Sequence, residues 1–409
     1  MLKSSFVLIF FFLAANLLAQ EKSTTPEDEF GINFKGFVKT DIMIDSRQTV
    51  SAREGHLLLY PQPEVLDANN EDINDKANLN MLSIQTRLTV SATGPRAFGA
   101  KTAAVVEGAF FGHSDGDING LRLRHAFLKL AWENSTLIVG QYWHPMFITD
   151  VFPGVISFNT GMPFQPFSRN PQIRFIQQIQ TLELTLTAAS QRDFSSMGPA
   201  GTSSIYLRNS VIPILDLNLK HKTQNFVVGA GINYKALTPR LITLNNYKTD
   251  KTINAISTMG FAKFVLDDFI LKLEAVYGQN NTDLLMLGGY AVKSTDIITG
   301  IEEYTAIKVF SAWTDLSFGK TVNFGLFAGI TKNLGSDDAI TGAVYARGAN
   351  IESVFRVSPR VSYKTGNTQF AGEIEYTSAK YGTPDNFGKV NNTTDVSNLR
   401  LLLAAYLYF

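Results

Sequence analysis

The sequence predicts an all-β protein, namely a transmembrane antiparallel β-barrel of about sixteen strands. Three observations predict it. Apolar and polar residues alternate in long runs, the connections between runs alternate in length, and charged residues make up only 18% of the 409 residues. A strand with one apolar and one polar face alternates in this way, and an outer-membrane barrel has short turns at one end and longer loops at the other.

The first alternating run covers residues 31–45. Ile32, Phe34 and Val38 fall on one face, while Lys35 and Lys39 fall on the other. Strands of soluble sandwiches usually have about 5–6 residues. The length of this run therefore favours a strand that crosses a membrane.

The same pattern recurs along the chain in sixteen runs, separated by seven short turns and eight mostly long loops in strict alternation. This alternation requires an even number of strands. It places the N-terminus and the C-terminus of the barrel on the same side of the membrane. A soluble sandwich has no reason to sort its connections in this way. The predicted strands lie near 31–45, 80–93, 100–112, 121–132, 136–144, 172–180, 182–191, 208–221, 226–236, 253–266, 269–279, 304–318, 323–333, 351–364, 368–379 and 398–409.

Composition narrows the possible functions. The formal net charge is zero, which predicts no nucleic-acid partner. The sequence has no cysteine, which excludes disulfides, thiolate metal sites and a cysteine nucleophile. Hydrophobic residues account for 45% of the chain, with 30 Phe and 14 Tyr. This composition suits a barrel in contact with outer-membrane lipid and lipopolysaccharide.

The N-terminal residues resemble an export signal. Lys3 precedes an apolar run over 6–18, and Ala19-Gln20 precedes a polar stretch. A basic start, a short apolar core and a small residue at the cut are typical of a secretory signal peptide. We therefore expect a signal peptide at 1–20, a short periplasmic segment at 21–29 and the barrel at 30–409, in the outer membrane of a Gram-negative bacterium.

The last strand ends with an aromatic residue. Leu401, Leu403, Leu407 and the terminal Phe409 share one face of the strand. This ending resembles the C-terminal signal that the bacterial outer-membrane barrel assembly machinery reads. Terminal aromatics also suit a membrane interface, and the strand must pair with the first one to remove the open edges of the sheet.

The loop over 145–171 is too apolar to lie in solvent and too rich in proline for a central strand. We therefore expect the third external loop to fold into the barrel lumen and to narrow it there. A loop packed over the rim or at a subunit contact is the alternative. The residues that we expect to form the constriction are Phe147, Phe152, Pro153, Phe158, Phe164 and Phe167.

The residues around this loop resemble a known family. The stretch Arg122-Leu123-Arg124-His125-Ala126 and the later Gly140-Gln141-Tyr142-Trp143 are similar to motifs of DcaP-like trimeric porins. Asn170-Pro171-Gln172-Ile173-Arg174 and Gly289-Tyr290-Ala291-Val292 extend the likeness. We expect no long N-terminal coiled coil of the kind that some members carry. The resemblance implies a homotrimer of barrels that passes small anions such as dicarboxylates.

Charges on the predicted inner face favour anions. If the apolar face meets lipid, twelve lysines and arginines point inward against seven acidic residues. Fixed positive charge in a narrow pore raises the local anion concentration. The alternative is that these arginines are structural and pair with lumen acids to hold the loop. The predicted pore-lining residues are Arg122, Arg124, Arg174, Arg87, Lys35, Lys39, Arg356, Arg360, Asp150 and Arg169.

Two other functions are alternatives for such a barrel. An enzyme is disfavoured because neither a Gly-x-Ser-x-Gly nor a His-Glu-x-x-His motif is present, and no two histidines have metal-ligand spacing. We expect His125 to face outward or to lie at a subunit contact, and we expect no metal or cofactor. A non-conducting barrel that acts as a receptor, an adhesin or a scaffold of an envelope assembly is the second alternative. Its long first loop, with an acidic run at 67–75, would then contact a partner.

Overall fold

The computed structural model describes residues 30–409, which form a closed antiparallel β-barrel. The predicted signal peptide and the segment 21–29 lie outside the described residues. Each wall strand pairs with its neighbours along the chain, and the last strand, β23, closes the barrel on the first, β1. In that closing pair Phe37 lies opposite Tyr408, and Asp45 lies opposite Arg400. The predicted sixteen-stranded barrel is confirmed.

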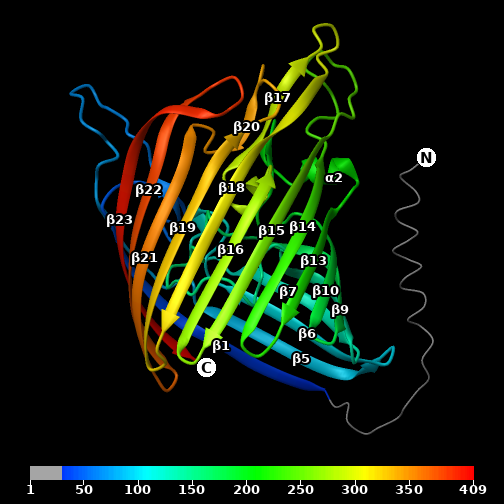
Figure 1. Ribbon diagram of the computed structural model, residues 1–409, viewed down its shortest axis with the longest axis vertical. Helices are drawn as coiled ribbons and strands as arrows, with labels where there is room; N and C mark the ends of the chain where they lie inside the picture. The colour runs from blue at the N-terminus through cyan, green and yellow to red at the C-terminus, as the bar shows by residue number, and fades with distance from the viewer. Residues whose placement is uncertain (1–29) are drawn as a thin grey trace.

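Short turns join the wall strands at one end of the barrel and long loops join them at the other, as the sequence predicts (Figure 1). The wall consists of β1 (Gly31–Asp45), β4 with β5 (Asn78–Leu82 and Arg87–Ala97), β6 (Ala100–Ala109), β7 (Arg122–Ala131), β8 (Ser135–Trp143), β9 (Arg169–Ile179), β10 (Leu182–Ala189), β13 (Ile214–Lys222), β14 (Phe226–Leu237), β15 (Ile253–Leu266), β16 (Phe269–Gln279), β18 (Glu302–Phe318), β19 (Val322–Gly335), β21 (Ile351–Thr365), β22 (Thr368–Pro384) and β23 (Val390–Tyr408).

Most wall strands lie within a few residues of their predicted bounds, but two are interrupted or shortened, and β23 begins at Val390 rather than at 398. The second strand is interrupted between β4 and β5, where Thr86 Oγ1 accepts a hydrogen bond of 3.2 Å from the backbone N–H of Lys39. The strand predicted at 208–221 begins only at Ile214 because the helix α2 (Ile205–Ser210) precedes it. Val211, with a φ of 63°, ends this helix in the left-handed region. Alternation of apolar residues alone does not reveal such interruptions.

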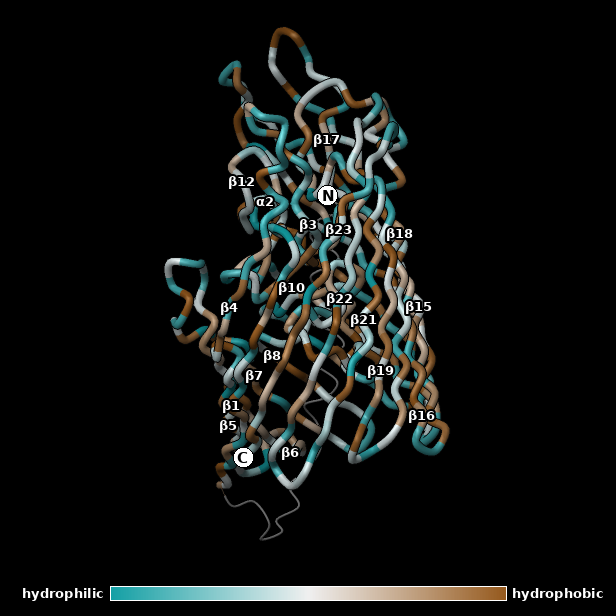
Figure 2. The backbone as a smooth tube through the Cα atoms, turned by 90° about the vertical axis from the view of Figure 1, so that its left-hand side faces the viewer, coloured by the Kyte–Doolittle hydropathy of each residue, from teal (hydrophilic) through white to brown (hydrophobic). Residues whose placement is uncertain are grey.

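The wall has an apolar outer face and a polar inner face. Along β23, Leu399, Leu401 and Leu403 are exposed, while Arg400 and Leu402 between them are buried. The colours of Figure 2 alternate in the same way along the strands. A strand that separates lipid from a lumen requires this arrangement. None of the helices in residues 30–409 has the length and apolar character needed to span a membrane.

The long loops carry secondary structure of their own. The first loop (46–77) contains a hairpin of β2 (Thr49–Ala52) and β3 (Leu57–Pro61), and the fourth contains β11 (Met197–Gly198) and β12 (Gly201–Thr202). The second and sixth loops contain the 3-10 turns η1 (Asp115–Asp117) and η2 (Thr282–Leu284). Above the rim, β17 (Gly288–Thr295) pairs with the upper part of β18 and with β20 (Val344–Arg347) (Figure 1).

Candidate functional site: the barrel lumen

The third loop (144–168) folds into the lumen, as predicted. Phe147, Pro153, Phe158, Phe164 and Phe167 are buried, and the four phenylalanines belong to the largest apolar core of the described residues together with side chains from the wall. Of the six residues predicted for the constriction, only Phe152 is exposed, and its ring stacks on Phe147 at 5.6 Å. The apolar loop is thus enclosed by the barrel.

Polar groups of the wall hold the backbone of the third loop. Lys39 Nζ donates to the carbonyl of Ile156 at 2.8 Å, and Arg356 Nη1 donates to the carbonyl of Met162 at 2.7 Å. The hydroxyl of Ser311 donates to the carbonyl of Phe164 at 2.9 Å. Buried carbonyls need such partners because no ladder satisfies them. Two of the predicted pore-lining cations, Lys39 and Arg356, therefore position the loop.

The first loop also folds inward. All five residues of β3 are buried, and Arg356 Nη2 donates to the carbonyl of Leu59 at 3.0 Å. Asn159 of the third loop accepts a hydrogen bond of 2.6 Å from the N–H of Leu58. The sequence predicts an inward position for the third loop and makes no such prediction for the first. The signal that could have revealed this burial is the run Leu57-Leu58-Leu59-Tyr60, which is as apolar as the third loop.

The sixth loop is the third element in the lumen. Leu284, Leu285, Met286 and Leu287 are buried, and the carbonyl of Leu284 accepts a 3.1 Å hydrogen bond from the N–H of Phe167. The sequence-based predictions do not include an inward position for this segment. At least three loops, rather than one, therefore fill part of the lumen.

Most of the predicted arginines are paired with acids. Arg122 and Arg169 both bind Asp193 at the start of the fourth loop, the latter at 2.7 Å. Burial alone would raise the pKa of the Asp193 carboxyl, but Arg169 and Arg122 outweigh burial and lower this pKa to about 2. Arg122 and Arg169 thus hold the start of the fourth loop against the wall. The sequence led us to expect Arg122, Arg124 and Arg174 to face Asp150 and Arg169, but Arg122 pairs with Asp193 instead.

Three further predicted arginines of the wall also pair with acids. Arg124 and Arg87 share Glu107, at 2.7 and 3.6 Å. Arg360 makes two hydrogen bonds to Asp315, at 2.7 and 3.0 Å. Arg400, which the sequence analysis missed, binds Asp45 in the same bidentate way. Lys35 is exposed near the start of β1. These arginines therefore fit the alternative in which lumen arginines are structural and pair with acidic residues.

Four guanidinium groups surround one phenyl ring in the upper lumen. Arg53, at the tip of the first-loop hairpin, lies 4.7 Å from the centre of the Phe111 ring. Arg122, Arg124 and Arg169 lie within 5.9 Å of the same ring. Burial and the charge of Arg122 lower the pKa of Arg53 to about 10. A guanidinium over an aromatic face is attracted by its quadrupole, so Phe111 allows these like charges to approach each other.

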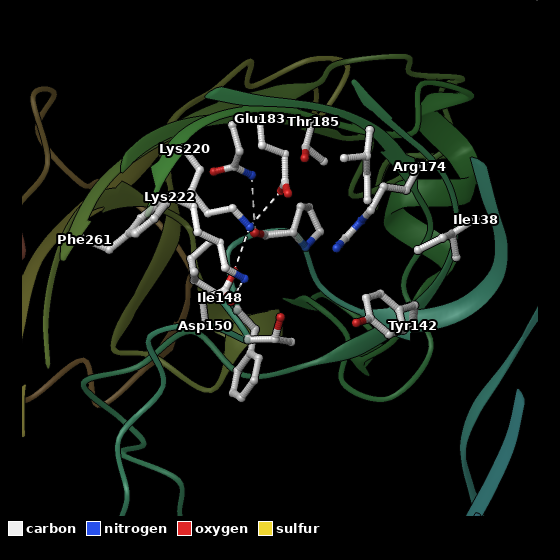
Figure 3. A pocket seen from close by; sticks show the side chains of 15 residues that line it. Ile138, Tyr142, Ile148, Asp150, Arg174, Glu183, Thr185, Lys220, Lys222 and Phe261 are labelled. Atoms are coloured by element: carbon white, nitrogen blue, oxygen red, sulfur yellow. Dashed lines mark hydrogen bonds and ion pairs between the residues drawn. The ribbon is translucent and has the colours of Figure 1, made fainter. Parts of the chain in front are cut away.

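A cavity of about 290 Å³ lies between the third loop and the half of the wall that bears the short turns (Figure 3). Asp150, from the loop, accepts bonds of 2.7 Å from both Lys220 and Lys222 of β13. Lys220 is also 2.7 Å from Glu183 of β10. Asp150 therefore faces lysines that the sequence analysis did not assign to it.

Arg174 of β9 points into the same cavity (Figure 3). Its Nε donates to Gln172 Oε1 at 3.0 Å, its Nη2 donates to the carbonyl of Trp143 at 2.7 Å, and its guanidinium lies 5.1 Å from the ring centre of Tyr142. Among the described residues, no carboxylate forms an ion pair with Arg174. Within residues 30–409, Arg174 is the only predicted selectivity arginine that lines this lumen cavity and forms no ion pair with a carboxylate.

His125 is placed differently from the prediction. It is only 6% exposed in the single chain, with Nε2 3.9 Å from Glu107 and its ring 5.3 Å from that of Trp143. The expected position at an outer surface or a subunit contact is therefore wrong. In the part of the chain that is described, no three His, Asp or Glu side chains gather in a way that could hold a metal ion.

Comparisons with known proteins agree on the fold. No family model matches the chain, and no curated protein is significantly similar in sequence. Among solved structures, the outer membrane channel DcaP of Acinetobacter baumannii matches with a TM-score of 0.67 at 16% identity, over 95% of this chain and 100% of that chain. The anion-selective porin from Comamonas acidovorans matches with a TM-score of 0.57 at 10% identity, over 93% and 100%.

Outer-membrane expressed OmpT of Vibrio cholerae is a further structural neighbour, with a TM-score of 0.56 at 12% identity, over 95% of this chain and 100% of that chain. At these identities the likeness establishes the fold. The resemblance to DcaP that the motifs predict is thus confirmed for the architecture, and the chain has the fold of outer-membrane porins.

Proposed function

We propose that this protein is an outer-membrane porin through which small anionic solutes diffuse. The observation that carries the proposal is the unneutralised guanidinium of Arg174 beside the inward-folded third loop, in a lumen cavity of about 290 Å³. A fixed cation on a narrow path attracts anions and repels cations. The anion-selective porin among the structural neighbours is consistent with this proposal.

The proposal also includes export, membrane insertion and assembly of the protein. The sequence signal at 1–20 would export the chain, and the strand ending in Phe409 would be read by the barrel assembly machinery. The exposed apolar outer face suits lipid and lipopolysaccharide of a Gram-negative outer membrane. The motif resemblance implies a homotrimer and dicarboxylate solutes. The proposal assigns no enzymatic activity to the chain.

A receptor, adhesin or scaffold is the second candidate function, and one observation favours it. Leu244, Ile297 and Ile298 are highly exposed at the tips of two long loops, and Asn245 Nδ2 ties these loops together by a 3.0 Å hydrogen bond to the carbonyl of Ile298. Exposed apolar groups far from the barrel wall suit a protein partner. Pull-down of a stable partner from intact cells would favour this candidate.

Conductance in planar bilayers separates the candidates. The purified protein should open in steps, three per trimer, and the reversal potential in a potassium chloride gradient should show chloride selectivity. The absence of conductance would refute the porin proposal. Cation selectivity would refute the role of the lumen cations while leaving a porin. A single conductance step in every insertion would refute the trimer.

A further inference from the structure

We infer that the cavity beside the third loop, defined by Arg174, Asp150, Lys220 and their neighbours, binds a small monocarboxylate with an apolar body and discriminates against dicarboxylates. This inference rests on the proposed anion porin and narrows its solute class. It departs from the dicarboxylates that the sequence motifs imply.

The charge balance of the cavity leaves room for one anionic group. Its lining contains the cations Arg174, Lys220 and Lys222 and the carboxylates Asp150 and Glu183. Lys220 lies 2.7 Å from both carboxylates, and Lys222 lies 2.7 Å from Asp150. The two lysines are therefore neutralised within the lining. Only the Arg174 side offers a positive charge that an incoming anion can neutralise.

Arg174 is held in one orientation. Gln172 and the carbonyl of Trp143 fix Nε and Nη2, and the plane of the guanidinium packs near the Tyr142 ring. No hydrogen bond of Nη1 is present among the described residues, and Figure 3 shows the Arg174 side chain pointing into the cavity. Glu183 and Asp216 act on Arg174 electrostatically, but neither comes within ion-pair distance of it among the described residues. A guanidinium that is fixed in orientation and has no acidic partner can bind one carboxylate.

The rest of the lining suits an apolar body. Ile138, Phe147, Ile148, Ile176 and Phe261 line the cavity, together with the uncharged polar residues Thr149, Thr185 and Asn218. A hydrocarbon chain or an aromatic ring would replace water at these surfaces. A second carboxylate would instead be placed either against this apolar wall or toward Asp150 and Glu183. Both positions are unfavourable, because an unpaired charge loses its hydration and like charges repel.

Pairs of probes that differ by one carboxylate test the inference. Butyrate and succinate have equal chain length, and benzoate and phthalate share a ring. We expect butyrate and benzoate to block the chloride current at concentrations at least tenfold lower than succinate and phthalate at pH 7. Calorimetry on the trimer in detergent should give the same order of binding. Equal or stronger action of the dicarboxylates would overturn the inference.

Variants locate the site. Arg174→Gln should raise the half-blocking benzoate concentration at least tenfold, while Lys293→Gln, which removes a cation from an external loop, should leave it unchanged. Normal heat-modifiable migration of both variants would show that they fold. An unchanged benzoate response in Arg174→Gln would overturn the inference. Chloride-selective conductance without a benzoate response would refute only this inference, whereas loss of chloride selectivity in the unmodified protein would refute the proposed function.

Discussion

The substitution Asp150→Asn is a sensitive test of how the third loop controls charge in the lumen. Asp150 bridges Lys220 and Lys222 at 2.7 Å each, and its side chain is 22% exposed. Lys220 keeps Glu183 as a partner, at 2.7 Å. Lys222, whose side chain is 51% exposed, loses its only ion-pair partner among the described residues. The variant therefore adds one net positive charge to the cavity at nearly constant shape.

The size of the effect follows from Coulomb's law. One unit charge about 8 Å from a permeating ion in a water-filled path, with a dielectric constant of about 80, contributes about 0.5 kcal/mol. This energy changes the local concentration of either ion by a factor of about two to three, so the unscreened ratio of chloride to potassium changes about sixfold, and screening at 0.1 M salt reduces that change to about two- to threefold. The Debye length is about 10 Å at 0.1 M salt and about 3 Å at 1 M salt. The effect should therefore be present at 0.1 M salt and largely lost at 1 M.

Reversal potentials across planar bilayers measure this effect. In a potassium chloride gradient near 0.1 M, Asp150→Asn should increase the ratio of chloride to potassium permeability about two- to threefold. Glu303→Gln is the matched control, because it removes the same charge from an exposed loop pair with Lys251. A ratio that is unchanged in Asp150→Asn, or raised equally in the control, would show that this cavity is not on the conducting path.

Three further predictions concern the loops and the wall. Replacing the hairpin 49–61 by a short glycine-serine linker should raise the single-channel conductance, since the buried strand β3 leaves the lumen; an unchanged conductance would place the path elsewhere. Arg360→Leu should destabilise the barrel by about 3–5 kcal/mol in denaturant unfolding, because it leaves a buried carboxylate unpaired. Adding Asp315→Leu should recover much of this loss, and failure to recover would argue against the pair. The carboxyl pKa of Asp193 is lowered from 3.8 to about 2, so its pairing stabilises the fold fully above about pH 4 and the contribution is lost as pH falls toward 2. Asp193→Asn should therefore be less stable than the unmodified protein at pH 7 and equally stable near pH 2, and a difference that persists at pH 2 would contradict the electrostatic origin.

The alternating pattern was sufficient to predict the wall because it reports a local property. Successive side chains of a strand point to opposite faces, so lipid on one side and a lumen on the other leave period-two runs in the sequence. The bounds of β1, β15 and β16 agree residue for residue with the predicted runs. The interruption between β4 and β5 was missed, because Ser83–Thr86 keep the same composition as a strand.

The charged residues of the lumen show the limit of local patterns. The sequence places Arg122, Arg174 and Arg360 on the inner face equally. Their partners are chosen by the register of neighbouring strands and by loops that arrive from distant parts of the chain. Arg360 meets Asp315 across the wall, Arg122 meets Asp193 from the fourth loop, and Arg174 meets no carboxylate within ion-pair distance in the described chain.

The sequence by itself thus determined the all-β architecture, the number of wall strands and the inward position of the third loop. The physical reason is that burial in lipid or in a lumen constrains each residue through its own polarity. Only the tertiary structure decided that the first and sixth loops also enter the barrel. It alone decided which cations are neutralised, because an ion pair depends on distances between residues far apart in the sequence.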